Sequence, residues 1–540
     1  MLGAMQDHEL RVTGLLDHVA LQHGYREIVT HWADGSETRT SWAGIRRDAL
    51  KMVAALRKLG IKTGDRIATL AMNHHRHLVS WYGAAGNGGI LHTINPRLFD
   101  EQLEYIINHA EDRVLLYDAE FGPIVDRIRP RCPTIRHFIC YDSGADTVAF
   151  EDWIAGEDEE GTTKWTTGGE REPCMLCYTS GTTGNPKGVL YEHRSTVLHA
   201  MTALQIGAME LGESSVVMPI VPMFHAASWG LPWCGAMIGA KFVYAQVNRP
   251  ATLCALMQRE RVTVGAGVPT VWLSVFQHLD DTGAALPDLR QVITGGSAPP
   301  RSMLERFMHM GVRVQHLWGM TEMSPIGTVA SESSDWEDLS FDERVRVKTA
   351  QGRTPYGVEM RCVDLDDGNV VLPRDGKTSG RLQVRGPWVL RRYFKAEEDA
   401  CGPDQWFDTG DVATIDPDGT LRITDRSKDV IKSGGEWISS VELENAAVGH
   451  PAVAEAAAIG IAHPKWDERP LLVVVIKPGG AVTADELREF LATRVAKWWL
   501  PDAVEFVDEI PHTGTGKISK KDLRDQFAGY VLPGTGAVAR

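Results

Sequence analysis

A loop rich in glycine and hydroxyl residues lies between two short apolar runs, and it restricts the possible fold more than any other segment. It covers residues 178–188 and reads YTSGTTGNPKG. Backbone N–H groups in such a loop can surround a phosphate group, and its single lysine adds a positive charge. Residues 175–178 and 189–191 are each typical of a short buried strand. The sequence therefore predicts a phosphate-binding loop that joins two strands, with a plain surface turn as the alternative.

The familiar P-loop does not match this segment. A P-loop has a glycine, four spacer residues and then Gly-Lys-Ser/Thr at the start of a helix. Here Lys187 follows Pro186 and precedes Gly188. Proline at this point also disfavours a helical turn. A nucleoside triphosphate remains the first ligand to consider, but on a loop between strands.

Helical and strand patterns alternate along the chain. Residues 100–107 contain a cap candidate followed by apolar residues at helical spacing, whereas residues 114–117 form one apolar run. Such alternation favours a mainly parallel α/β fold. A chain of 540 residues is also too long for one core, so we expect at least two domains.

Charge and hydropathy exclude several classes of function. The chain has 56 Lys and Arg against 71 Asp and Glu, a net charge of −15, which argues against nucleic-acid or membrane-surface binding. The N-terminal residues lack the pattern of a signal peptide, so we expect a cytoplasmic protein. Residues 216–240 carry no Asp, Glu, Lys or Arg, but prolines and glycines interrupt them. We expect a buried strand, loop and helix there, not a membrane span.

The eight cysteines show no disulfide or zinc framework. Cys174 and Cys177 form a Cys-x-x-Cys pair within the first apolar run. Residues three apart in a strand point to opposite faces, so these two cannot share a metal ion. We expect both to be small buried apolar residues.

The loop at 178–188 resembles the phosphate-binding signature of the adenylate-forming superfamily, which includes acyl-CoA synthetases, firefly-type luciferases and peptide-synthetase adenylation domains. Six further segments resemble motifs of that superfamily and follow in the same order over most of the chain. They are residues 222–225 (PMFH, with Trp229 after them), 295–299 (GGSAP), 317–322 (LWGMTE), 406–411 (WFDTGD), 425–435 (DRSKDVIKSGG) and 511–517 (PHTGTGK).

The resemblance implies an α/β fold in two parts. The large N-terminal adenylation domain, residues 1–426, would contain mainly parallel sheets flanked by helices plus a distorted β-barrel. Residues 427–540 would form a small, mobile α+β lid domain. The implied reaction joins a carboxylic acid to ATP, giving an acyl-adenylate and pyrophosphate. The thiol of CoA then attacks the adenylate and releases AMP.

Charge neutralisation is the main task of such a site, because the first step brings a carboxylate to a triphosphate. The resemblance implies that Lys517 bridges the carboxylate and the α-phosphate, while Thr321 hydrogen-bonds that phosphate. Glu322 would bind Mg²⁺ together with Thr183, since a carboxylate near phosphates needs a cation between them. His225 would complete the catalytic set at the mouth of the acyl pocket.

The nucleotide site is expected to draw on several motifs. Asp411 has a short acceptor side chain suited to the ribose hydroxyls, and Arg426 could donate to the same sugar. Trp318 replaces the commoner tyrosine of the superfamily, so it can pack against adenine but lacks a phenolic hydrogen bond. The expected ATP ligands are Thr179, Ser180, Gly181, Thr182, Thr183, Gly184, Lys187, Gly296, Ser297, Ala298, Pro299, Trp318, Gly319, Met320, Asp411 and Arg426.

The hinge is expected at Lys428, which stands at the position of the superfamily's hinge residue. Rotation there would replace the face of the small domain that carries Lys517. The face around Gly434 and Gly435, with Lys432 beside it, would then line a tunnel for CoA.

The acyl pocket is expected to be apolar and shortened by indole rings. Its predicted lining is Trp229, Trp233, Val268, Met320 and Met323. Such bulk favours a short or medium-chain, thioether or aryl-alkanoic acid.

Residues 95–98 and 317–325 resemble the bacterial medium-chain acyl-CoA synthetases, particularly those acting on 3-methylmercaptopropionate. Arylpropionate activation and the loading of a carrier protein are alternatives. A non-catalytic nucleotide-binding scaffold is the alternative of a different class. A homodimer is a further expectation.

Overall fold

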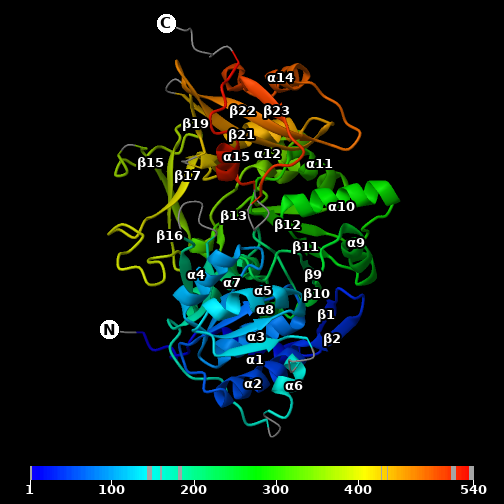
Figure 1. Ribbon diagram of the computed structural model, residues 1–540, viewed down its shortest axis with the longest axis vertical. Coiled ribbons are helices and arrows are strands. Elements are labelled where there is room, and N and C mark those ends of the chain that lie inside the picture. Colours follow the sequence, from blue (N-terminus) through cyan, green and yellow to red (C-terminus); the bar gives the residue numbers. More distant parts are fainter. Residues whose placement is uncertain are drawn as a thin grey trace.

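A computed structural model gives the fold of the protein (Figure 1). It describes residues 3–142, 149–157, 161–179, 185–365, 367–426, 429–433, 436–512 and 518–533. Strands β19, β21, β22 and β23 lie at one end of the molecule, and helices α1, α2 and α6 lie at the other.

The first large sheet has six strands in the order β6-β5-β3-β4-β7-β8. All neighbours run parallel except β7 and β8. The strands are β3 (Arg66–Leu70), β4 (Ile90–Thr93), β5 (Asp112–Tyr117), β6 (His137–Cys140), β7 (Pro173–Tyr178) and β8 (Gly188–Glu192). The helices of this part are α1 (Val12–Gln22), α2 (Trp42–Lys58), α3 (His75–Gly86), α4 (Asp100–Ala110), α5 (Gly122–Ile128) and α6 (Phe150–Ile154).

The second large sheet has eight strands in the order β14-β13-β12-β11-β9-β10-β1-β2. Its central strands are parallel, and an antiparallel strand closes each edge. The strands are β1 (Glu27–His31), β2 (Glu37–Ser41), β9 (Val216–Pro219), β10 (Lys241–Ala245), β11 (Val264–Ala266), β12 (Gln291–Gly295), β13 (Arg313–Gly319) and β14 (Ile326–Val329). The helices are α7 (His193–Ala203), α8 (Leu231–Ile238), α9 (Pro250–Arg259), α10 (Pro269–Thr282), α11 (Arg301–His309) and α12 (Phe341–Thr349).

Two smaller sheets follow. The first, where the distorted barrel was expected, is a four-stranded antiparallel sheet of β15 (Glu359–Val363), β16 (Gly380–Arg385), β17 (Phe407–Ile415) and β18 (Leu421–Arg426). The second contains β19 (Ile431–Ser433), β20 (Glu436–Ile438), β21 (Val453–His463), β22 (Asp467–Ile476) and β23 (Ala503–Phe506), with helices α13 (Ser440–Val448), α14 (Ala484–Ala492) and α15 (Lys520–Gln526). The change of sheet falls after Arg426, but a domain boundary between 426 and 427 stays a prediction.

The sequence predictions for local structure are confirmed. The apolar runs at 175–178 and 189–191 are strands β7 and β8, which pair antiparallel. The helix expected at 100–107 is α4, although Phe99 is its N-cap and Asp100 its first residue. Residues 216–240 form β9, a 3₁₀ turn and α8. No helix in the described ranges is long and apolar enough to cross a membrane. The mixed α/β fold with a separate C-terminal part is the predicted one.

Helices of both large sheets share one core. Helix α1 contacts α2, α3, α7 and α8, and the largest buried apolar cluster draws residues from both sheets. Cys174 and Cys177 are buried in this core, as predicted. Burial raises the pKa of Cys174 to about 12 and that of Cys177 to about 11, so both thiols stay protonated and inert.

Candidate active site

The carboxyl ends of parallel strands bring several motifs to one edge of the eight-stranded sheet. Strands β9, β11, β12 and β13 run parallel, and a predicted site segment follows each of them. Residues 220–225 follow β9, Val268 follows β11, residues 296–299 follow β12, and residues 320–322 follow β13. Ligands of α/β proteins bind at this edge. The fold therefore places these distant segments at a single candidate site.

The six-stranded sheet contributes a second edge to the same site. Thr179 follows β7, and its N–H donates to the carbonyl of Lys187 at 2.9 Å, which closes the base of the phosphate loop. Tyr178 and Thr179 line a small crevice together with Phe224 and His225. The start of the phosphate loop and the aromatic-histidine motif thus face one opening.

A three-residue link joins the loop to the carboxylate motif. The ammonium group of Lys187 lies over the ring of Tyr393, 4.8 Å from its centroid. The Tyr393 hydroxyl donates to Oε1 of Glu322 at 2.8 Å. Burial and the nearby Glu322 raise the pKa of Tyr393, so the phenol remains a donor. The N–H of Phe394 donates to Gly188 O at 2.8 Å and holds this tyrosine beside β8.

Sequence reasoning missed Tyr393, because none of the recognised motifs contains it. Its only sequence signal is that Tyr393 and Phe394 form an aromatic pair after Arg391 and Arg392. Such a pattern is typical of many surface segments. The pairing of Phe394 with Gly188 reveals its place.

The segment containing Thr321 and Glu322 is held by its backbone. Both residues are buried. The hydroxyl of Tyr191 donates to Thr321 O at 2.7 Å, and the N–H of Leu390 donates to Glu322 O at 2.7 Å. The two side chains that were predicted to face phosphate and metal therefore stand on a fixed turn.

The indole of Trp318 lies against a glycine. A methyl group at Gly327 would lie 2.6 Å from a ring carbon of Trp318 and 2.8 Å from the terminal carbon of Met323. Only a residue without a side chain lets both groups keep their positions. Gly327 is a second residue that sequence reasoning missed, since a lone glycine in a strand carries no specific signal.

The other nucleotide residues lie at strand ends or on a neighbouring sheet. Gly296 has a φ of 82° and is exposed with Ser297, whereas Pro299 is buried. Asp411 is buried on β17 and is the direct antiparallel partner of Arg426 on β18. The pair proposed for the ribose is therefore adjacent in the backbone.

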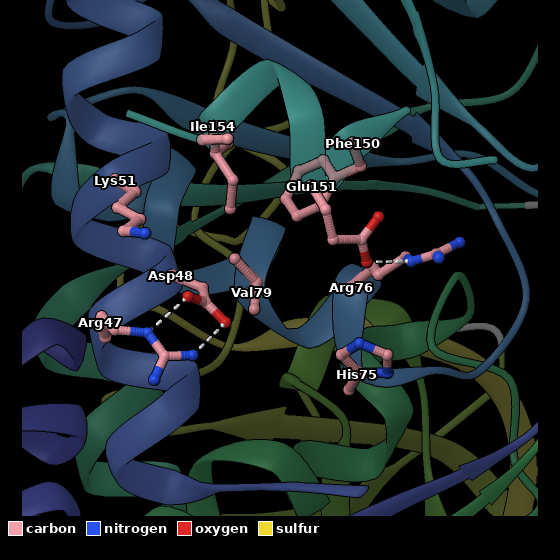
Figure 2. Close-up of a pocket in the computed structure, with 10 residues that line it drawn as sticks. Arg47, Asp48, Lys51, His75, Arg76, Val79, Phe150, Glu151 and Ile154 are labelled. Atoms are coloured by element: carbon pink, nitrogen blue, oxygen red, sulfur yellow. Dashed lines mark hydrogen bonds and ion pairs between the residues drawn. The ribbon is translucent and has the colours of Figure 1, made fainter. Parts of the chain in front are cut away.

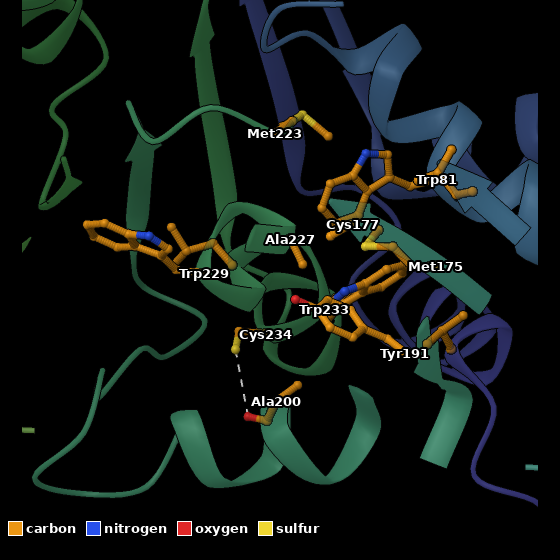
Figure 3. Close-up of a cluster of buried hydrophobic side chains, with 14 of the residues drawn as sticks. Trp81, Met175, Cys177, Tyr191, Ala200, Met223, Ala227, Trp229, Trp233 and Cys234 are labelled. Atoms are coloured by element: carbon orange, nitrogen blue, oxygen red, sulfur yellow. Dashed lines mark hydrogen bonds between the residues drawn. The ribbon is translucent and has the colours of Figure 1, made fainter. Parts of the chain in front are cut away.

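The predicted acyl pocket residues differ in burial. Trp229 and Met323 are buried, and Val268 and Met320 are partly exposed. Trp233 packs inside the core, with ring centroids 5.1 Å from Trp81 (Figure 3). The assignment of all five to the pocket stays a prediction.

Some predicted site residues lie outside the described ranges. They are Ser180, Gly181, Thr182, Thr183, Gly184, Lys428, Gly434, Gly435 and Lys517. Lys432 is described and exposed, and its backbone N–H donates to Oε2 of Glu468 at 3.0 Å.

A separate cavity of about 210 Å³ lies between α2, α3 and α6 (Figure 2). Arg47 pairs with Asp48 and Arg76 pairs with Glu151 on its walls. No predicted site residue lines it. Its charged groups largely neutralise one another, so it is not the candidate active site.

Two α/β sheets that meet at a lysine-bearing loop and a buried carboxylate, with a separate C-terminal part, define a nucleotide-using α/β enzyme. The chain belongs to the AMP-binding enzyme family, which matches residues 16–394, and the C-terminal domain of that family matches residues 442–517.

Curated relatives match nearly the whole chain. A 3-methylmercaptopropionyl-CoA ligase of Ruegeria lacuscaerulensis is 48% identical, over 98% of this chain and 99% of the relative. A medium-chain-fatty-acid–CoA ligase of Ectopseudomonas oleovorans is 44% identical, over 100% of both chains. The crystal structure of an anthranilate CoA ligase with anthranoyl-AMP has a TM-score of 0.86 at 24% identity, over 96% of this chain and 98% of that one, and shares the fold. The chain is an AMP-forming acid–thiol ligase, with ATP and CoA as substrates.

Proposed function

We propose that this ligase activates a short- or medium-chain carboxylic acid, or a thioether acid such as 3-methylmercaptopropionate. Two relatives bear the name of that thioether ligase, at 48% and 46% identity, and a medium-chain ligase stands at 44%. The observation that carries the reaction is the link from Lys187 through Tyr393 to Glu322. It connects the loop that would hold the outgoing pyrophosphate to the carboxylate that would lie beside the reacting phosphate.

In the first half-reaction, a carboxylate oxygen of the acid attacks the α-phosphorus of ATP, and the bond to pyrophosphate breaks. Lys187 and the hydroxyls of the loop would hold the β- and γ-phosphates. Thr321 would donate to the α-phosphate, and Lys517 would bridge that phosphate and the acid. Each of these groups reduces the repulsion between two anions, which is the largest barrier to the step.

Glu322 suits a magnesium ion. Its carboxylate is buried, and one oxygen is oriented by the Tyr393 hydroxyl. Mg²⁺ bound with a nucleotide needs only one or two protein carboxylates besides phosphates and waters. When bound, the ion would neutralise phosphate charge. Thr183 would be its second protein ligand.

In the second half-reaction, the thiol sulfur of CoA attacks the acyl carbon of the adenylate, and AMP leaves. We propose that rotation at Lys428 brings the Gly434-Gly435 face, with Lys432 beside it, to the site. The enzyme would act in the cytoplasm, where ATP and CoA are both available. A homodimer is part of the same proposal.

Buried indoles support a pocket of limited length. The indole N–H groups of Trp81 and Trp233 are buried and find no hydrogen-bond partner among the described residues. Buried donors without partners are rare in proteins and are commonly satisfied by a ligand or water. An acid that ends near these rings must be short or compact. An arylpropionate is compact, so arylpropionate activation remains the alternative.

A panel of carboxylic acids, assayed with and without CoA, tests this function. The panel should include 3-methylmercaptopropionate, butyrate, octanoate, palmitate and 3-phenylpropionate. We expect acid-dependent pyrophosphate release, with acyl-CoA and AMP formed only when CoA is added. The thioether or medium-chain acids should have the highest kcat/KM. Preference for palmitate would contradict the proposed acyl class, and transfer only to a carrier protein would favour the loading enzyme.

Lys517→Ala tests the catalytic assignment. It should abolish pyrophosphate release while leaving ATP binding largely intact, because its contact forms mainly in the transition state. Lys521→Ala is the matched control, since Lys521 is exposed at the start of α15. Near-normal adenylation by the Lys517 variant would remove the assignment.

A further inference from the structure

Asn73 connects the two large sheets at the site. It follows β3 of the six-stranded sheet and precedes α3, and its side chain is buried. Its Nδ2 group donates to Pro219 O at 2.8 Å and to Val221 O at 2.9 Å. Its Oδ1 atom accepts the N–H of Met223 at 2.7 Å. One side chain thus binds three backbone groups of the segment that leads from β9 to the aromatic-histidine motif.

Asn73 stands on a rigid base. The N–H of Met72 donates to Oδ2 of Asp118 at 2.8 Å, and Nε2 of His74 hydrogen-bonds Oδ1 of the same carboxylate at 2.8 Å. The His74 ring accepts the N–H of His77 through Nδ1, so Nε2 carries the proton and donates. Both neighbours of Asn73 are therefore fixed to one buried carboxylate, and its amide has a defined direction.

The segment held by Asn73 leads into an unusual turn. Ala226, Ala227, Ser228 and Trp229 have φ values of 42°, 51°, 47° and 56°. L-residues adopt this left-handed region as single residues, and each one costs free energy. A run of such residues persists only where the surroundings hold it. Ser228 Oγ contributes one such contact, a donation to Val221 O at 3.3 Å.

Val221 is therefore bound from both sides. Asn73 reaches its carbonyl from the six-stranded sheet, and Ser228 reaches the same carbonyl from within the left-handed turn. His225 lies between Val221 and Ser228 in the sequence, and Trp229 directly follows Ser228. A change in the direction of the Asn73 amide must move the backbone on which both side chains stand.

We propose that Asn73 is a positioning residue for the acid substrate. It fixes residues 219–223 and the left-handed turn, and thereby sets the positions of His225 and Trp229 at the mouth of the acyl pocket. The inference rests on the proposed function of that pocket. It extends the function to a residue that follows a strand of the other large sheet and acts through the backbone of residues 219–223.

Asn73→Asp is the sharpest variant, because it keeps the shape of the side chain and the acceptor for Met223 but loses both donors. Pyrophosphate release should be measured with the acid and ATP varied separately. We expect kcat/KM for the acid to fall about tenfold to a hundredfold, with KM for ATP changed less than about twofold. Asn73→Ala should show the same selective loss.

Asn87→Ala is the matched control. Asn87 is also a buried asparagine, at the other end of α3, and donates to Ile61 O at 3.4 Å. Its replacement should lower the melting temperature without a selective loss toward the acid. Equal effects of Asn73→Asp on acid and ATP, or unchanged kinetics in the folded variant, would overturn the proposal.

Ser228→Ala decides the matter if both Asn73 variants fail to fold. It removes the second anchor of Val221 and should show the same acid-selective loss at smaller amplitude, whereas unchanged acid kinetics would overturn the proposal. The wild-type acid panel distinguishes a failure of the proposed function from a failure of the Asn73 proposal. An inactive wild type refutes the proposed function, whereas an active wild type with unaltered Asn73 variants refutes only this inference.

Discussion

Mild acid should destabilise the large N-terminal part of the protein through four buried histidines. Burial lowers the pKa of each of them from 6.5 to about 3, and they are His75, His77, His193 and His199. Two of these rings accept backbone hydrogen bonds: Nε2 of His199 accepts the N–H of Ile326 at 3.2 Å, and Nδ1 of His193 accepts that of Val12 at 3.3 Å. Protonation of either acceptor nitrogen would break its bond.

The direction of the pH effect follows from the pKa of these histidines in the unfolded chain, 6.5, and in the folded protein, about 3. Below pH 6.5 the unfolded chain binds protons that the folded protein refuses, so the free energy of unfolding falls as the pH drops toward 3. At a pH of about 5.5, each histidine lowers that free energy by about 1.4 kcal/mol. The four together lower it by about 5–6 kcal/mol, which is comparable with the whole stability of many domains. Above pH 6.5 this penalty is absent.

Urea titrations at several pH values between about 7.5 and 5.5 measure the effect, with tryptophan fluorescence as the signal. Near pH 6, unfolding should take up about three protons from these four sites. His199→Gln and His193→Asn keep an acceptor close to each ring nitrogen, and each should reduce the uptake by about three quarters of a proton. Uptake of less than about one proton in the wild type would refute the reasoning.

Three further substitutions test single contacts. Tyr393→Phe should lower kcat/KM for ATP by about tenfold, because Glu322 loses the hydroxyl that orients it; unaltered ATP kinetics would contradict this link. Gly327→Ala places a methyl group 2.6 Å from the Trp318 ring and should displace the indole. ATP should then bind more weakly in calorimetry. An unchanged affinity would show that the indole does not contact the nucleotide. Glu260 bonds three cations, Arg39, Lys241 and Arg259, and its pKa is lowered from 4.5 to about 2. Its stabilisation is present above pH 4.5 and is lost as the pH falls toward 2. Glu260→Gln should lower the free energy of unfolding at neutral pH by only about 2 kcal/mol, since Arg39 and Arg259 are partly exposed; an unchanged urea midpoint would count against it.

Local patterns sufficed for the elements around the phosphate loop. The runs at 175–178 and 189–191 are continuously apolar because both strands are largely buried. The order of motifs predicted the family and the fold class. Parallel strands then bring the motif residues to one edge, so the segments around Val268 and Glu322 converge without any pattern of their own.

Long-range contacts determine what the sequence could not predict. Tyr393 becomes part of the site only because Phe394 pairs with Gly188, far away in the chain. Trp233 was expected at the pocket wall from its position after His225, and this stays a prediction; its contact with Trp81 joins α8 to α3 and has no sequence signal. A sequence pattern contains only residues that are close in the chain. The Phe394–Gly188 hydrogen bond and the Trp233–Trp81 contact each join residues that are far apart in it.

Asn73 shows how a contact between distant parts of the chain can affect the binding of the acid substrate. A single buried asparagine has no sequence signature, yet its three bonds cross from one sheet to a loop of the other. The crevice between Thr179 and His225 is therefore bounded by two sheets whose relative position one side chain helps to fix. If acid selectivity depends on that position, ligases of this family can differ in substrate through residues that never contact it. Exchanging the residues that pack around Asn73, with the pocket lining kept constant, should then shift the preferred acid, whereas an unchanged preference would locate selectivity in the lining alone.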